Sequence, residues 1–227
     1  MIVSIHQPYY FPWLGFFEKI INADVFVYLD DVQYEKRNFY NRNKIKVPNG
    51  SAWITVPVMD SYKKNMLDVE INNKENWQKK HLSSIIHNYK KAPFFKDHEE
   101  FLEEVFLKKK WTKLIDLNFF TLNYLLDALS IDTPIEYSSK LNIKSTATQR
   151  LLDITKAVGA NTYFSGSSGS KYMETELFDK ENINIIYQDY KTPEYKQLGK
   201  GFEPNLSILD LLLNYGPDSK EIILSYK

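Results

Sequence analysis

The feature that most constrains the fold is a strand, a helix and a second strand within the first thirty residues. The runs IVSI (residues 2–5) and VFVYL (residues 25–29) are apolar and rich in β-branched or aromatic residues, as short buried strands are. Between them, residues 14–21 carry apolar side chains at helical spacing. A unit of this size is typical of a crossover between two parallel strands.

The same alternation of strand and helix returns after Pro134. The patterns predict strands over 135–139, 161–165 and 183–188, and helices over 147–160, 170–182 and from Ser207 to Gly216. Alternating helices and strands favour an α/β fold with a mostly parallel sheet flanked by helices.

An all-helical middle region interrupts this alternation. Ile115, Phe119, Leu122, Leu126 and Leu129 recur at spacings of four and three, which marks one face of a helix. A further strand is expected over 52–58, after a basic, amide-rich loop. We therefore expect a single α/β domain over residues 1–227, with a helical insertion at about 76–130.

Charge and cysteine content narrow the possible functions. Lys and Arg number 29, and Asp and Glu also number 29, so no global field favours nucleic acid or an anionic membrane as a partner. The absence of cysteine excludes disulfides, thiolate metal sites and a thiol nucleophile. No secretory signal or apolar run of membrane-spanning length occurs, and no histidine spacing predicts a metal site. We expect a cytoplasmic protein without a membrane or nucleic-acid partner.

The first candidate site is the turn HQPYYFPWLG, which joins the first strand to the first helix. Ligands of parallel sheets bind beyond the carboxyl ends of the strands, where His6 and Gln7 fall. Pro8 and Pro12 restrict the turn. His6 has two open interpretations, a catalytic base and a structural hydrogen-bonding group. The further candidates for substrate binding in this turn are Tyr10 and Trp13.

The second candidate site is LDDVQYEKRNFYNRNKIK, which follows the strand over 25–29. Asp30 and Asp31 lie at the end of that strand and are candidates to orient His6. Donors for phosphate or sugar hydroxyls follow closely, and the candidates among them are Gln33, Arg37, Asn41, Arg42 and Lys44. The alternative is a solvated loop, but their crowding beside a strand end favours binding.

The third candidate site is YFSGSSGSKYM, residues 163–173, between a strand and a helix. The two glycines and the serines favour a loop that binds an anion through backbone amides and hydroxyls. The candidate binding residues are Ser165, Gly166, Ser167 and Ser168. The alternative is a flexible loop without a ligand. Because this loop and the turn after His6 both follow parallel strands, we expect them to converge on one cleft. His81 shares a helical face with apolar residues and is expected in the core or in a cleft, where it is a further candidate for substrate binding. His87 and His98 are expected on the surface.

Taken in order, HQPYYFPWLGFFEKI, LDDVQYEKR, NRNKIK, AWITVPV, WQKKHL, YFSGSSGSKYM and FEPNLSILDLLLNYGP resemble the WbqC-like protein family from the first strand to the last helix. The family is encoded among genes for bacterial O-antigen and other surface polysaccharides. Its members are described as glycine-type or other acyl transferases to sugar amines. The resemblance therefore implies a transferase of polysaccharide biosynthesis.

The residues and the resemblance together lead to a first hypothesis, an acyl or aminoacyl transferase that acts on the amine of a nucleotide-linked amino sugar. His6 would be the base, and Gln7, Asn41 and Ser165 would donate hydrogen bonds to the oxyanion. The donor would be an acyl thioester borne on phosphopantetheine, with an acyl or peptidyl carrier protein as partner.

Two alternatives stay open. His6, Leu14-Gly15 and the SGSSGSK loop are similar in order to the motifs of HIGH-type nucleotidylyltransferases, although the second histidine of that motif is missing. Such an enzyme would require Mg²⁺ and release pyrophosphate. The other alternative is a non-catalytic protein that binds the same sugar nucleotide.

Overall fold

The computed structural model describes residues 1–226, which form two compact units. Unit 1 consists of Met1–Pro8, Gly15–Val32 and Ile131–Lys191, and unit 2 consists of Tyr9–Leu14, Gln33–Ser130 and Thr192–Lys227. Both units are discontinuous in sequence. The division into one domain with an insertion at about 76–130 stays a prediction.

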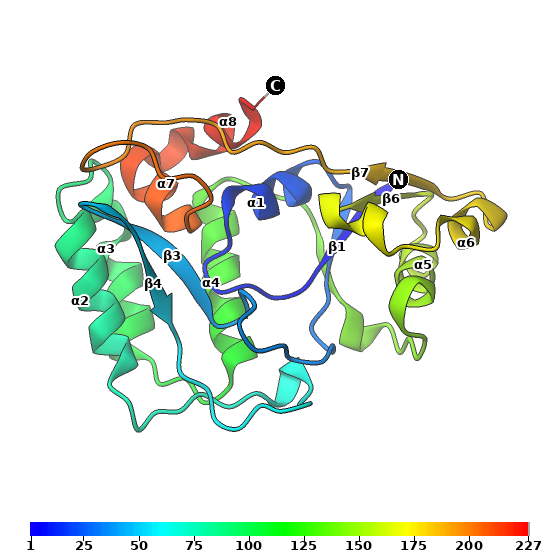
Figure 1. Ribbon diagram of the computed structural model, residues 1–227, viewed down its shortest axis with the longest axis horizontal. Helices are drawn as coiled ribbons and strands as arrows, with labels where there is room; N and C mark the ends of the chain where they lie inside the picture. The colour runs from blue at the N-terminus through cyan, green and yellow to red at the C-terminus, as the bar shows by residue number, and fades with distance from the viewer. Residues whose placement is uncertain (227) are drawn as a thin grey trace. The chain divides into compact units, whose positions relative to one another are not determined.

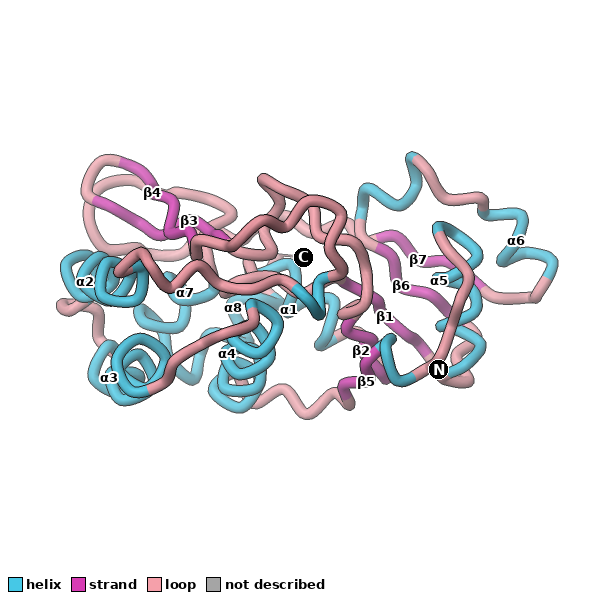
Figure 2. The backbone as a smooth tube through the Cα atoms, turned by 90° about the horizontal axis from the view of Figure 1, so that it is seen from below, coloured by secondary structure: helices cyan, strands magenta, loops and turns pink. Residues whose placement is uncertain are grey.

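Unit 1 contains a five-stranded sheet in which every neighbouring pair is parallel. The strand order is β5-β2-β1-β6-β7, and Figure 2 shows these strands side by side. The strands are β1 (Ile2–His6), β2 (Val25–Tyr28), β5 (Ile135–Tyr137), β6 (Thr162–Ser165) and β7 (Asn184–Tyr187). Helices α1 (Leu14–Ile21), α5 (Ala147–Ala157) and α6 (Thr175–Lys180) flank the sheet. The predicted α/β class with a mostly parallel sheet is confirmed.

The core of unit 1 forms because the central strands are apolar on both faces. All four residues of β2 are buried, as parallel strands covered on both sides require. Val3 and Ile5 of β1 pack with Val27 of β2 in a cluster that also includes Leu152 of α5 and Phe178 of α6. The crossover connections thus fix the carboxyl ends of β1, β2, β5, β6 and β7 at one edge of the sheet.

Unit 2 is mostly helical and carries one antiparallel hairpin. The hairpin consists of β3 (Arg42–Val47) and β4 (Gly50–Thr55), and β3 packs against α2 and α7 (Figure 1). The remaining elements are η1 (Met66–Asp68), α2 (Trp77–Tyr89), α3 (Phe95–Glu103), the π-helical η2 (Glu104–Lys108), α4 (Leu114–Ala128), α7 (Ile208–Tyr215), η5 (Gly216–Asp218) and α8 (Ser219–Leu224). The predicted all-helical middle region corresponds to α2 through α4.

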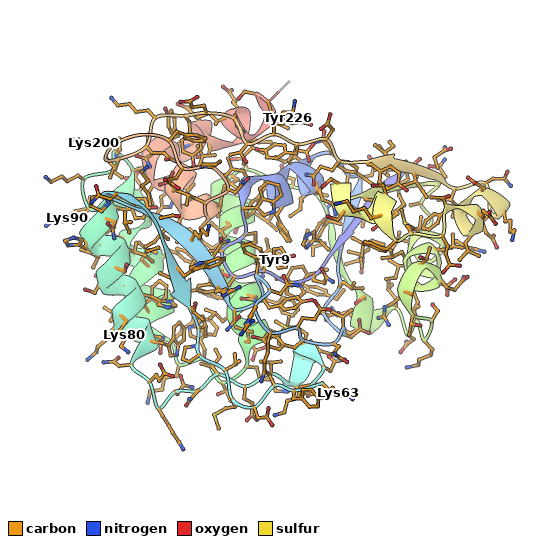
Figure 3. The ribbon with its side chains drawn as sticks, in the orientation of Figure 1. Tyr9, Lys63, Lys80, Lys90, Lys200 and Tyr226 are labelled. Carbon is orange, nitrogen blue, oxygen red and sulfur yellow. The ribbon has the colours of Figure 1, made fainter. Side chains whose placement is uncertain are left out.

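Helix α2 shows why this region is helical and where it packs. Trp77, His81 and Ile85 recur every four residues and are buried. Lys80 and Lys90 are exposed on the same element (Figure 3). The predicted inward orientation of His81 is confirmed, and His87 is exposed as expected. His98 was expected on the surface, but it is buried, and its Nδ1 lies 2.7 Å from the Tyr124 hydroxyl.

The strand β3 was not predicted, because its sequence RNKIKV reads as part of a basic loop. In the structure Asn43 and Lys46 of this strand are buried. The Asn43 amide donates to the carbonyl oxygen of Phe11, and the Lys46 ammonium donates to that of Gly201 at 2.9 Å. The strand expected over 52–58 ends at Thr55 and pairs with β3. It therefore belongs to a hairpin.

Two helix boundaries also differ from the expectation. The helix expected over 170–182 is divided into a 3-10 turn, η4 (Ser167–Lys171), and the short helix α6. The spacing of Ser207 and Asp210 suggests a capping box, and the Ser207 hydroxyl does accept the amide of Leu209. The Asp210 carboxylate instead accepts hydrogen bonds from the hydroxyls of Tyr89 and Tyr195. Gly216 ends α7 in a left-handed conformation, as expected.

None of the helices formed by residues 1–226 is both long enough and apolar enough to cross a bilayer.

Candidate functional site

The parallel strands of unit 1 bring parts of all three predicted segments to one edge of the sheet. β1 ends at His6, which lies opposite Tyr28 in β2, and Asp30 follows two residues later. On the other side of β1, Ser4 pairs with Phe164, so the loop that begins at Ser165 starts beside the end of β1. His6 and this loop thus lie at the same edge of the sheet, and their convergence on one cleft stays a prediction. This group of strand ends and loops is called the sheet edge below.

His6 is held in one tautomer by the backbone. Its Nδ1 lies 2.9 Å from the carbonyl oxygen of Gln7, and a carbonyl can only accept, so Nδ1 carries the proton and Nε2 carries the lone pair. The ring packs edge-on against Phe16. Burial and the positive charge of Lys19 lower the pKa of His6 to about 3, although the hydrogen bond to Gln7 opposes this shift. His6 is therefore neutral at physiological pH.

Asp30 and Asp31 connect β2 to the turn after β5. Asp30 is buried and accepts hydrogen bonds from the Ser139 amide at 2.9 Å and the Ser139 hydroxyl at 2.7 Å. Asp31 accepts from the Ser138 hydroxyl and forms an ion pair with Arg150 of α5. These contacts give both carboxylates a structural role at the sheet edge. Their predicted role in orienting His6 stays a prediction.

The segment 163–173 contains one buried and three exposed serines. The Ser165 hydroxyl donates to the carbonyl oxygen of Gly166 at 3.2 Å, and Ser165 is buried. A Cβ atom at Gly169 would lie 2.1 Å from that hydroxyl, so the turn requires glycine there. Ser167 and Ser168 are exposed, as are Ser170, Lys171 and Tyr172.

Lys19 is a residue of the sheet edge that the sequence analysis did not identify. It lies on α1, is 3% exposed, and donates from Nζ to the carbonyl oxygen of Ile5 at 3.0 Å. Burial lowers the pKa of Lys19 to about 7, and the negative charge of Glu18 acts in the opposite direction. The signal in the sequence was a charged pair, Glu18-Lys19, inside the otherwise apolar run LGFFEKII.

Unit 2 contains a separate pocket of about 400 Å³ beside the hairpin. Its lining residues are Tyr34, Lys36, Arg37, Asn41, Arg42, Thr55, Val58, Met59, Asp60 and Ser61. Three of them are cationic and one is anionic. Arg42 Nε and Ser61 Oγ are buried and have no hydrogen-bond partner among the residues that the structure describes. The pocket therefore offers positive charge and polar atoms available to a ligand.

Aromatic rings lie next to the cations of this pocket. The guanidinium carbon of Arg42 lies 4.3 Å from the centre of the Trp53 ring, and Lys44 Nζ lies 5.3 Å from it. Trp53 is 44% exposed and contacts Phe39, which in turn contacts Tyr9. The sequence analysis missed Trp53 and Phe39, because an exposed aromatic residue cannot be told from a core residue by pattern alone.

Several predicted binding residues serve the core of unit 2. The hydroxyl of Tyr10 contacts His81 Nδ1 at 2.9 Å, and His81 Nε2 donates to the carbonyl oxygen of Thr55 at 3.1 Å. Both ring nitrogens of His81 are thus used, and burial lowers its pKa to about 4. The Asn41 amide donates to the carbonyl oxygen of Val56 at 2.8 Å.

The other predicted binding residues vary in exposure. Gln7 is half-buried beside His6, and Trp13 is half-buried and forms a β-bridge with Ser207. Gln33 is exposed and forms a β-bridge with Asn65, and Arg37 is exposed. Within residues 1–226 no three histidine, aspartate or glutamate side chains gather as a metal-binding group.

Comparison with known proteins identifies relatives of the whole chain. A family model described as the WbqC-like protein family matches residues 7–222. A protein of Mycobacterium tuberculosis that is described as uncharacterized is 35% identical over 224 residues, which cover 97% of this chain and 96% of that protein. No solved structure matches the chain.

Proposed function

The chain belongs to the WbqC-like protein family, and from this premise we propose that it transfers an acyl or aminoacyl group, such as a glycyl group, to the amine of a nucleotide-linked amino sugar. The reaction would serve the biosynthesis of surface polysaccharide. The observation that carries the proposal is the cationic pocket of unit 2 with its adjoining exposed aromatic rings.

The pocket suits a nucleoside diphosphate for two chemical reasons. Arg37 and Arg42 supply guanidinium groups, which bind phosphate oxygens in a bidentate manner, and Lys36 adds a further positive charge. Arg42 Nε is buried and has no partner within residues 1–226, and leaving such a donor unsatisfied costs free energy that a bound phosphate oxygen would recover. Trp53 and Phe39 offer exposed ring faces on which a base or sugar can stack.

The chemistry is assigned to the sheet edge. The amine nitrogen attacks the thioester carbonyl carbon, the C–N bond forms and the C–S bond breaks. The proton that the nitrogen loses passes to His6 Nε2 and then to the leaving thiolate. Because Nδ1 donates to the carbonyl oxygen of Gln7, Nε2 carries a lone pair for this step. The low pKa of His6 keeps the imidazole neutral until the amine nitrogen, which becomes acidic when it attacks the carbonyl carbon, gives up its proton. The half-buried Gln7 amide is the donor that we assign to the oxyanion.

The donor is proposed to be an acyl thioester on phosphopantetheine, presented by a carrier protein. The chain contains no cysteine, so no thiol acyl-enzyme can form, and direct attack by the amine is the simplest route.

Binding is tested first, by calorimetric titration with UDP-linked and dTDP-linked amino sugars. Arg42→Ala should weaken binding about 10- to 100-fold, which corresponds to about 1.5–3 kcal/mol for a lost charge-assisted hydrogen bond. Lys96→Ala is the matched control, because Lys96 lies on α3, forms an exposed ion pair with Glu99 and does not line the pocket. Equal affinity in wild type and Arg42→Ala would contradict the assignment of the pocket.

Transfer is tested by thiol release from acyl-pantetheine or acyl-carrier thioesters in the presence of the amino sugar. A disulfide reagent reports the released thiol without background from the enzyme, because the chain has no cysteine. The expected result is thiol release that depends on the amine, with an amide product found by mass spectrometry. Binding without thiol release would contradict transfer and favour a non-catalytic binding protein, and pyrophosphate release from a triphosphate with Mg²⁺ would favour nucleotidyl transfer.

A further inference from the structure

Lys19 is a buried cation that makes few of the contacts a buried cation requires. An ammonium group has three donors, and the one hydrogen bond that Lys19 makes within residues 1–226 goes to the carbonyl oxygen of Ile5. No carboxylate in that part of the chain forms an ion pair with Lys19. Buried charges are normally paired, because removing an ion from water is costly.

The neighbouring carboxylate does not meet this need. Glu18 precedes Lys19 in α1, but its Oε1 accepts from the Asn22 amide at 2.9 Å and its Oε2 accepts from the Gln188 amide. Glu18 therefore binds groups on its own helix and beyond the end of β7. Its charge acts on Lys19 through space and leaves the donors of Nζ available.

The side chain of Lys19 lies against the loop that follows β6. A Cβ atom built at Gly166 would lie 4.0 Å from Lys19 Nζ, and this is the nearest atom to it outside the chain neighbours. Glycine thus leaves the space beside the ammonium open. The exposed hydroxyls of Ser167 and Ser168 come next in the chain, and His6 lies close enough for the charge of Lys19 to lower its pKa.

We propose that Lys19 and the Gly166–Ser168 loop form a binding site for a phosphate group at the sheet edge. The ammonium supplies the charge-assisted hydrogen bond, and the two serine hydroxyls supply further donors, which suits a group with several anionic oxygens. The site lies within unit 1 and is distinct from the cationic pocket of unit 2, so it goes beyond the proposed sugar-nucleotide pocket.

Proton uptake on binding provides a signature of this site. Burial lowers the pKa of Lys19 to about 7, so at pH 8 most molecules carry a neutral amine there. A bound anion favours the charged form, and the protein must take up a proton as it binds. Sulfate is a suitable probe, because it mimics phosphate and does not itself titrate near this pH.

The experiment is a calorimetric titration of the full chain with sulfate at pH 8, at constant ionic strength, in buffers of different ionisation enthalpy. Wild type should take up most of one proton per sulfate bound. Lys19→Met should lose that uptake and bind sulfate at least tenfold more weakly. Lys156→Met is the control and should behave as wild type, because Lys156 is an exposed lysine of α5 that pairs with Glu181. Equal affinity and proton uptake in Lys19→Met would overturn the proposal.

A second measurement needs no variant and so covers the case in which Lys19→Met fails to fold. The side-chain NMR signals of Lys19 in wild type with isotope-labelled lysine are followed from pH 6 to pH 9, with and without sulfate. Sulfate should raise the midpoint of the Lys19 titration by at least one pH unit, because a bound anion favours the charged form, while the signals of the exposed Lys156 stay unchanged. An equal midpoint for Lys19 in both samples would overturn the proposal.

Competition identifies the source of the phosphate. Displacement of sulfate by 4′-phosphopantetheine would assign the site to the thioester donor, and displacement by a nucleoside diphosphate sugar in Arg42→Ala, in which the cationic pocket is weakened, would assign it to the acceptor. These titrations do not depend on thiol release, so failure of the transferase proposal and failure of this site are separate results.

Discussion

At the scale of single residues, one basic group of the sheet edge influences the other. His6 and Lys19 are both largely removed from water, and burial lowers the pKa of each, to about 3 and about 7. The charge of Lys19 lowers the pKa of His6 further. An unusual concentration of shifted pKa values is typical of functional sites. Because both pKa values are lowered, neutral forms of His6 and Lys19 are available near physiological pH.

Replacement of His6 distinguishes between its two possible roles, a proton acceptor in catalysis and a structural hydrogen-bonding group. If His6 Nε2 accepts the proton of the amine, His6→Gln should fold normally and lower kcat about 100-fold or more, since a general base contributes about 10² to 10⁴. The pKa of about 3 means that His6 stays neutral from pH 5 to pH 8. The ratio of wild-type to His6→Gln turnover should therefore be constant over that range, although both rates change as the substrate amine titrates.

Turnover and melting temperature of the same His6→Gln preparation decide the outcome. Near wild-type turnover in a well-folded variant would end the catalytic assignment. A turnover ratio that falls as pH drops through 6.5 would show that the imidazole titrates normally and would contradict the effect of burial.

At the scale of elements, the turn after β6 depends on close packing of small residues. Ser165 is buried, and the backbone of Gly169 approaches its hydroxyl so closely that a Cβ atom would overlap it. Gly166, three residues earlier, has open space and only Lys19 Nζ at 4.0 Å. One glycine thus serves packing and the other leaves room beside a cation.

Substitutions in this turn should show the difference. Gly169→Ala should lower the free energy of unfolding by about 1–3 kcal/mol, as overpacking does, because the Ser165 hydroxyl must move. Gly166→Ala should stay within about 0.5 kcal/mol of wild type. The measurement is urea denaturation of both variants.

A double variant tests the cause. In a Ser165→Ala background the nearest remaining atom of residue 165 is its Cβ, at 3.4 Å from the added methyl, so Gly169→Ala should cost less there than in wild type. An equal cost in both backgrounds would show that the hydroxyl is not the obstacle.

At the scale of the whole molecule, the chain contributes three separate segments to each unit. The carboxyl-terminal segment belongs to unit 2, where Asp210 accepts hydrogen bonds from Tyr89 at 2.9 Å and from Tyr195 at 2.8 Å. The Lys46 ammonium donates to the backbone of Lys200 and Gly201. Buried polar groups of α2 and β3 therefore depend on partners far along the sequence.

Truncation tests this dependence. A chain that ends at Lys191 should lose hydrogen-exchange protection in α2 and β3, because Tyr89 and Lys46 lose their partners, while β1 and β6 keep theirs within unit 1. A chain that ends at Asp218 retains Asp210 and Gly201 and should lose much less protection. Unchanged protection of α2 in the shorter chain would contradict the role assigned to these bonds.

The pattern of apolar residues along the chain was sufficient to predict the sheet of unit 1 and to locate its candidate residues at the ends of the strands. Its strands are short apolar runs, and the alternation with helices leaves a parallel arrangement as the simplest solution. Once strands are parallel, their carboxyl ends share an edge, so the sequence alone is sufficient to group His6, Asp30 and Ser165. The helices of the middle region followed from their periodicity in the same way.

Tertiary contacts decided which polar residues are buried. Lys19, Asn43 and Lys46 look like ordinary solvated residues in sequence, yet each is inside because a backbone carbonyl from another element accepts its hydrogen bond. Tyr10 and His81 looked like binding residues, yet they satisfy each other in the core. The cost of burying a polar group depends on whether a partner is present, and that partner is 14 residues away for Lys19 and 155 for Lys46. Hydrophobic periodicity carries no information about such partners, so the strand β3 and the cation at the sheet edge became visible only in the folded chain.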